Sequence, residues 1–137
     1  MSASLSNFPH ISQRDGDINS TDDCVAACVA MGLQFLTGRK YTAGEVKDAV
    51  YGASYTGGTA AIRYEAYCSE QGVTLSSISG DGQGLVSALK AQIRAGHPCV
   101  ITEPDPYESG WSHCCAAYAF NTDAQTITVV DPWIDRT

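Results

Sequence analysis

In the first two thirds of the chain, apolar residues recur every three or four positions, which is the spacing of helices that bury one face. The most apolar segment runs from Asp22 to Leu36 and is apolar on almost all sides. We therefore expect a buried central helix there, capped at its start by one of residues 20–22 and ended by Gly38. This placement puts Cys24 in the first turn of the helix.

Three further helices are expected in the same part of the chain. A second helix starts at Thr42, because Glu45 three residues later completes a capping box. Thr59 is the expected cap of a third helix, which Gly72 ends. The glycine-rich run Ser79–Gly84 predicts a turn that leads into a fourth helix.

Strand-like runs dominate the remainder. They predict strands at Pro98–Glu103, His113–Phe120 and Gln125–Asp131, with one earlier short strand at Val73–Ile78. Because helices come first and most strands last, the order predicts an α+β domain instead of alternating βαβ units. We expect residues 1–137 to form a single domain, in which a helical N-terminal half packs on a C-terminal antiparallel sheet.

Composition and charge exclude several classes of protein. The chain has 137 residues with 15 acidic and 8 basic side chains, which give a formal net charge of -7. This charge disfavours binding to nucleic acid, and no apolar run is long enough to span a bilayer. The first ten residues lack the features of a signal peptide, so we expect synthesis in the cytoplasm. The six cysteines are then expected to be mostly free thiols.

One cysteine and one histidine lie where thiol chemistry needs them. Cys24 falls at a predicted helix start, where the helix dipole stabilises a thiolate, and His113 opens a predicted strand. An isolated cysteine in such a helix is more often a small packed residue than a nucleophile. Further motifs are needed to decide between these two interpretations.

Five sequence fragments in a fixed order favour catalysis. They are Gln13, DCVAACVAM from Asp23 to Met31, GHPCVI from Gly96 to Ile101, His113, and DPW from Asp131. Together they resemble the papain-like, bacteriocin-processing (double-glycine leader) peptidases and their lysin-type relatives, over nearly the whole chain. The resemblance implies a papain-like cysteine peptidase fold whose central helix carries the cysteine.

The resemblance also implies a role for four residues. Cys24 is the expected nucleophile and His113 its base, while Asp131 orients the imidazole. Gln13 is the expected side-chain donor of the oxyanion hole. Electrostatics favours the same roles, because a carboxylate supports an imidazolium and an amide N–H stabilises a developing oxyanion. Val25 replaces the glycine that commonly follows the nucleophile in this family, so we expect a bulkier cleft wall and an altered specificity.

The two-residue period of strands sets a condition on the hairpin that carries His113 and Asp131. In two regular antiparallel strands, the numbers of facing residues add up to a constant sum. His113 and Asp131 share a face only if that sum is even, as the sum of 113 and 131 is. We therefore expect a hairpin loop with an odd number of residues, such as Asn121–Asp123. An even loop without a β-bulge would put Asp131 on the far face of the sheet.

Two metal sites find little support in the sequence. A calcium loop that starts at Asp15 would lack the glycine and the glutamate of its sixth and twelfth positions. Its oxygen-bearing residues are Asp15, Asp17, Asn19, Thr21 and Asp23. A zinc site is disfavoured because neighbouring strand residues face opposite ways; its candidate ligands are His97, Cys99, His113, Cys114 and Cys115. We expect no metal and no cofactor.

The substrate is the least constrained property. Gln13 and Cys24 are 11 positions apart, a spacing longer than in transporter-linked leader peptidases and closer to lysin-type domains. We expect a monomeric phage or bacterial endopeptidase domain, part of a longer protein, that acts on the cell wall and cuts peptidoglycan peptides. The alternatives are a leader peptidase that cleaves after a double-glycine site, and an inactive module that binds peptides in the same cleft.

Overall fold

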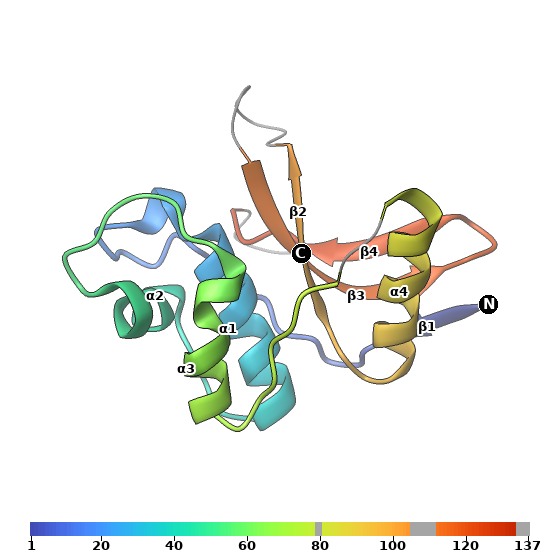
Figure 1. The fold of residues 1–137 in the computed structure, drawn as a ribbon, viewed down its shortest axis with the longest axis horizontal. Coiled ribbons are helices and arrows are strands. Elements are labelled where there is room, and N and C mark those ends of the chain that lie inside the picture. The colour runs from blue at the N-terminus through green and yellow to red at the C-terminus, as the bar shows by residue number, and fades with distance from the viewer. Residues whose placement is uncertain (79–80, 105–111, 134–137) are drawn as a thin grey trace.

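The structure is a computed structural model that describes residues 1–78, 81–104 and 112–133. Helices α1, α2 and α3 lie together on one side of the molecule, and α4 lies with the strands on the other side (Figure 1). The strands that form the sheet pair antiparallel, so the predicted α+β class is confirmed. Within these described ranges, no helix is long and apolar enough to cross a membrane.

Helix α1, Cys24–Thr37, is the central helix that the apolar pattern predicts. Residues 25–31 are all buried, as expected for a helix that is apolar on almost all sides. Gly38 ends the helix with φ 77°, a left-handed conformation that glycine adopts without strain. The predicted cap is wrong, because Ser20–Asp22 form the short 3-10 helix η1 and Asp23 takes the cap position.

Helix α2, Ala43–Tyr51, begins where the capping box predicts. The backbone N–H of Glu45 donates to Thr42 Oγ1 at 3.1 Å, and the backbone N–H of Thr42 donates to Glu45 Oε1 at 2.7 Å. These reciprocal bonds satisfy two donors that the first helical turn leaves unpaired. The prediction of this helix start is confirmed.

The third predicted helix is present in two pieces, the 3-10 helix η2 at Ala61–Tyr64 and the α-helix α3 at Glu65–Glu70. Its expected cap is wrong. Thr59 Oγ1 instead accepts a hydrogen bond from the buried hydroxyl of Tyr64 at 3.0 Å. This contact uses the threonine for packing, and the first turn has no side-chain cap.

The segment between α3 and α4 differs from its prediction. Residues 73–78 form no strand, and Val73 and Leu75 pack on the helical core without pairing to the sheet. Helix α4, Gly82–Arg94, begins inside the glycine-rich run, so the turn is shorter than predicted. Residues 79 and 80 of that run lie outside the described residues.

Strand β3, Ser112–Asn121, is the strand to which the other strands of the described residues pair. Strands β2, Cys99–Pro104, and β4, Thr126–Val130, were expected, and their positions are confirmed within one or two residues. Strand β1, Ser2–Ser4, was not predicted, because three residues are too few to show an alternating pattern. It pairs with the C-terminal end of β3, opposite residues 119–121.

The β3–β4 hairpin meets its parity condition by a β-bulge. Asn121 faces Thr126, which leaves an even loop of residues 122–125 and contradicts the expected odd loop. The register then shifts between Ala117 and Ala119, so Tyr118 is the extra residue of a bulge. Beyond the bulge the sums of paired numbers are even, and the side chains of His113 and Asp131 share one face.

Two clusters of apolar side chains form the core. The larger cluster joins α1, α2 and the segment after them to the sheet, and it includes Met31, Tyr64 and Ala116. The smaller cluster holds α4 against β1 and β3 through Leu89 and Phe120. Both clusters meet at β3, so the strand that carries His113 is held by apolar packing from two clusters.

Candidate active site

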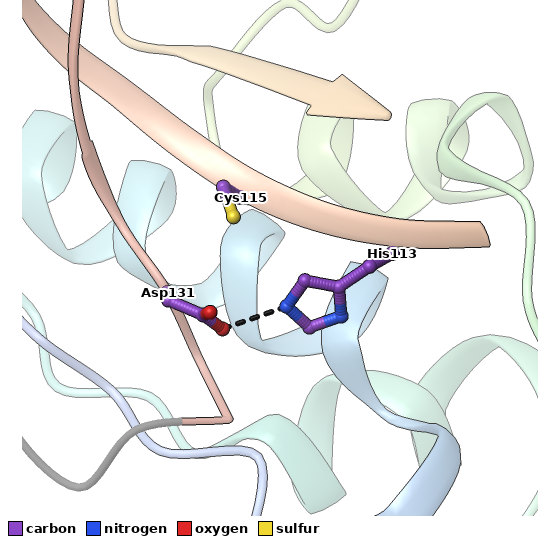
Figure 2. A group of neighbouring side chains, drawn as sticks. All are labelled: His113, Cys115 and Asp131. Carbon is purple, nitrogen blue, oxygen red and sulfur yellow. Dashed lines mark hydrogen bonds and ion pairs between the residues drawn. The ribbon is translucent and has the colours of Figure 1, made fainter. Parts of the chain in front are cut away.

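His113 and Asp131 form the central contact of the site. His113 Nε2 lies 2.6 Å from Asp131 Oδ1, and the histidine is only 4% exposed (Figure 2). Because a carboxylate can only accept, Nε2 carries the proton and donates it, which leaves Nδ1 as the basic nitrogen of a neutral ring. The predicted pairing of these two residues is therefore present in the structure.

The residues after β4 hold the Asp131 carboxylate in place. Asp131 Oδ1 also accepts the backbone N–H of Trp133 at 2.9 Å, which is an Asx turn built by the DPW motif. Pro132 follows the aspartate and is buried. The motif thus fixes the direction of the carboxylate toward β3 before any substrate is present.

Gln13 lies beside the same motif. Its backbone N–H donates to the carbonyl oxygen of Pro132 at 2.9 Å, and its side chain is buried, with 1% of the residue exposed. Gln13 Nε2 donates to the carbonyl oxygen of Ser20 at 3.0 Å, while Oε1 is buried without a partner among the described residues. An amide nitrogen has two N–H groups, so the second one is the donor that an oxyanion could use.

Cys24 occupies the first position of α1, where the helix dipole favours a thiolate. Its half-buried thiol contacts Cys114, the residue next to His113 in β3. The hydrogen bond from Cys24 to the Cys114 sulfur, followed by burial, raises the pKa of Cys24 well above its ordinary value, and nearby His113 lowers it. The contact with Cys114 therefore disfavours the thiolate that the helix dipole favours.

A change at Cys114 should therefore alter the reactivity of Cys24. The hydrogen bond that Cys24 donates to the Cys114 sulfur stabilises the protonated form of Cys24. The variant Cys114→Ala should therefore lower the pKa of Cys24 and raise its thiolate fraction at pH 7. We expect Cys24 to react faster with iodoacetamide in this variant, followed by peptide mass spectrometry between pH 6 and 10. Cys68→Ala, a change at a buried thiol on α3, is the matched control. Identical pH profiles for wild type and Cys114→Ala would contradict this account.

A buried network of hydrogen bonds precedes the nucleophile candidate, and apart from its acidic residues no sequence pattern predicts it. Asn19 Nδ2 donates to Asp23 Oδ1 at 2.7 Å and to the carbonyl oxygen of Gly57 at 2.9 Å. The backbone N–H of Gly57 returns a bond to Asn19 Oδ1 at 2.6 Å. Burial, the largest cause, raises the pKa of Asp23 from 3.8 to about 7, and the Asn19 hydrogen bond opposes this. The network fixes the loop in front of Cys24.

The raised pKa of Asp23 predicts a pH-dependent stability. The folded protein binds this proton up to about pH 7 and the unfolded chain only up to about 3.8, so the contribution is full below pH 4 and is lost as the pH rises to 7. The loss is on the order of 4 kcal/mol. Asp23→Asn should remove this slope from the free energy of unfolding, measured in urea at pH 4.5, 6 and 7.5. Asp22→Asn is the control; equal slopes in wild type and Asp23→Asn would contradict the assignment.

The two metal sites considered from the sequence have different outcomes. The acidic loop uses its carboxylates internally: Asp15 accepts the backbone N–H of Gly44, and Asp17 Oδ2 lies 3.5 Å from the buried Lys47 ammonium. The zinc candidate His97 is exposed and bonds Gln92 on α4. Cys115, however, shares a face with His113, and its sulfur lies close to both His113 and Asp131.

Comparison with known proteins assigns the chain to a family. Residues 5–137 match the Peptidase_C39 like family, which is nearly the full length of the chain. No curated protein and no solved structure matches the chain. Sequence motifs, the cysteine at the start of α1 and the family match lead to the same result: the chain belongs to the Peptidase_C39 like family.

Proposed function

We propose that this protein is a cysteine peptidase of papain-like arrangement, with Cys24 as nucleophile, His113 as base and Asp131 as the residue that orients the base. The observation that carries the proposal is the 2.6 Å contact between His113 Nε2 and Asp131 Oδ1, made by the buried imidazole on β3 and the partly exposed carboxylate of the DPW motif. The Cys24 thiol lies against Cys114, the residue that follows the histidine in β3, and His113 is near enough to lower the pKa of Cys24. The family match supports peptidase chemistry in general.

The proposed reaction proceeds in two stages. Cys24 transfers its proton to His113 Nδ1, and the sulfur attacks the carbonyl carbon of the peptide bond. The oxyanion accepts hydrogen bonds from the backbone N–H of Cys24 and from Gln13 Nε2. His113 then gives its proton to the leaving amine, and water hydrolyses the thioester to restore the thiol. Substrate binding must first break the contact of Cys24 with Cys114.

Gln13→Ala tests the oxyanion donor. We expect kcat to fall ~10²-fold or more while KM changes little, because this hydrogen bond strengthens in the transition state. Gln13→Glu keeps the size of the side chain, removes the N–H donors and should be similarly slow. Steady-state kinetics and thermal unfolding of both variants separate a catalytic loss from a folding defect. An unchanged kcat in folded Gln13→Ala would remove this residue from the proposed site.

We place peptidoglycan peptides first among the substrates. Support comes from the separation of 11 positions between Gln13 and Cys24, which is closer to lysin-type domains than to leader peptidases. The net charge of -7 adds no support for a nucleic-acid or other polyanionic partner. A leader peptidase that cleaves after a double glycine is the second candidate, and an inactive peptide-binding module is the third.

One experiment separates these three functions. The protein is incubated with purified bacterial cell walls and, separately, with a peptide that contains a double-glycine leader site. New amino termini from the walls alone support the lysin activity, and cleavage of the peptide alone supports the leader peptidase. Cys24→Ala must release no product in either incubation. A folded wild-type protein that cleaves neither substrate, yet binds one, would favour the inactive module.

A further inference from the structure

A group of three potential metal ligands includes a cysteine that the proposed mechanism does not use. A nitrogen of His113, the Cys115 sulfur and a carboxylate oxygen of Asp131 all lie within 4.8 Å of one another. Figure 2 shows the three side chains directed toward a common point between β3 and the end of β4. His113 and Cys115 are two positions apart on a strand, so they share a face by the period of the strand.

The chemistry of these three ligands suits zinc. Thiolate, imidazole and carboxylate bind Zn²⁺ at about 2.0–2.3 Å, and three protein ligands with one open position are common. Calcium and magnesium are poor alternatives, because both prefer all-oxygen sites. Neighbouring ligand atoms around a tetrahedral Zn²⁺ are roughly 3.3–3.6 Å apart, given those bond lengths. The ligand atoms here lie within 4.8 Å of one another, and the 2.6 Å pair of His113 Nε2 and Asp131 Oδ1 must move apart by roughly 1 Å to admit the ion.

We propose that His113, Cys115 and Asp131 form a Zn²⁺ site that inhibits the peptidase reversibly. Binding releases the thiol proton of Cys115 to solvent, and Zn²⁺ takes the place of the Nε2 proton between His113 and Asp131 while that ring proton moves to Nδ1. Coordination at Nε2 leaves the ring proton on Nδ1, so this nitrogen has no lone pair to accept the proton of Cys24. The inhibitory part of this inference rests on the proposed peptidase function, whereas metal binding does not.

The location of the site favours a reversible inhibitor over a structural ion. Cys115 is 2% exposed, but the Asp131 side chain keeps 15% of its surface accessible, which gives an ion a path from solvent. Three protein ligands leave one position for water, unlike the closed four-ligand sites that stabilise folds. The fold also has its own apolar core around β3, so it does not depend on an ion at this point.

Metal binding is tested directly and without any substrate. Zn²⁺ is titrated by calorimetry into wild type, Cys115→Ser, Cys24→Ala and the control Cys68→Ser, and Co²⁺ is added to report thiolate coordination by its charge-transfer absorption. We expect one ion per chain in wild type, with affinity lowered at least ~10²-fold in Cys115→Ser and retained in Cys24→Ala and Cys68→Ser. Equal affinity in wild type and Cys115→Ser, or its loss in Cys24→Ala, would overturn the site.

Inhibition is tested on whichever substrate the protein cleaves. The rate at increasing Zn²⁺ is divided by the metal-free rate of the same variant, so differences in basal activity cancel. Wild type should lose activity at the concentrations that fill the calorimetric site and recover it with a chelator, and Cys115→Ser should need at least ~10²-fold more Zn²⁺. Binding without inhibition would refute the inhibitory role alone, and a protein without peptidase activity would refute the proposed function and leave the site standing.

Discussion

Cys24→Ala is expected to reduce peptide hydrolysis by at least ~10³-fold, because the sulfur that forms the covalent intermediate is lost. The fold should change little. Cys24 is half-buried at the first position of α1, and alanine is a strong helix former. The measurement is the initial rate of release of new amino termini, with circular dichroism and thermal unfolding to show that the variant is folded.

Cys28→Ser is the matched control, because Cys28 lies one turn further along α1 and is fully packed. A hydroxyl in that apolar position should lower the free energy of unfolding by roughly 1–3 kcal/mol and leave hydrolysis largely intact. Cys115→Ser adds the decisive comparison, since the Cys115 sulfur is also close to His113 and Asp131. Full activity in Cys24→Ala with loss of activity in Cys115→Ser would move the nucleophile from α1 to β3.

The helices show what local sequence signals can and cannot predict. The α2 capping box needs only Thr42 and Glu45, three residues apart, and the helix begins there. Thr59 offers a capping hydroxyl but no acidic residue three positions later, and it bonds the hydroxyl of Tyr64, a residue that the tertiary fold buries beside it. A cap is therefore predictable where nothing competes for the side chain, and unreliable where a buried polar group needs a partner.

The strands of the sheet were predictable where apolar and polar residues alternate along them. Strand β1 and the β-bulge were not predictable from the sequence. Parity excluded any unbulged even loop, because such a hairpin would separate His113 from Asp131. It could not decide between an odd loop and an even loop with a bulge, and the structure has the second. The choice rests on packing: Tyr118, the extra residue, stacks on Phe8 with ring centroids 5.2 Å apart, a contact between segments far apart in sequence.

The candidate site was predictable where motifs name residues, and unpredictable where only burial defines them. The motifs indicated His113 and Asp131, and the structure brings these two side chains into contact. The Cys24 contact with Cys114 and the proximity of Cys115 to the histidine depend on how α1 meets β3, which no local pattern encodes. The raised pKa of Asp23 likewise comes from burial that the acidic run does not suggest.

Asp131→Ala should lower kcat by ~10²-fold or more, because the imidazole of His113 then loses the acceptor that fixes its tautomer and supports its positive charge. KM should change little, since in the proposed mechanism Asp131 acts on the substrate only through His113. The measurement is steady-state kinetics on the substrate that the wild type cleaves. An activity near wild type would mean that another acceptor holds His113.

The alanine variant alone does not separate orientation of the histidine from support of the turn, because Asp131 Oδ1 also accepts the backbone N–H of Trp133. Asp131→Asn resolves this, since its amide oxygen can accept both N–H groups while the negative charge is lost. If the charge matters for catalysis, Asp131→Asn should be as stable as wild type and yet lie between wild type and Asp131→Ala in kcat. If Asp131 only shapes the turn that anchors Gln13, the Asp131→Asn variant should have full activity. Asp131 would then have a structural role and would not be a member of the catalytic triad.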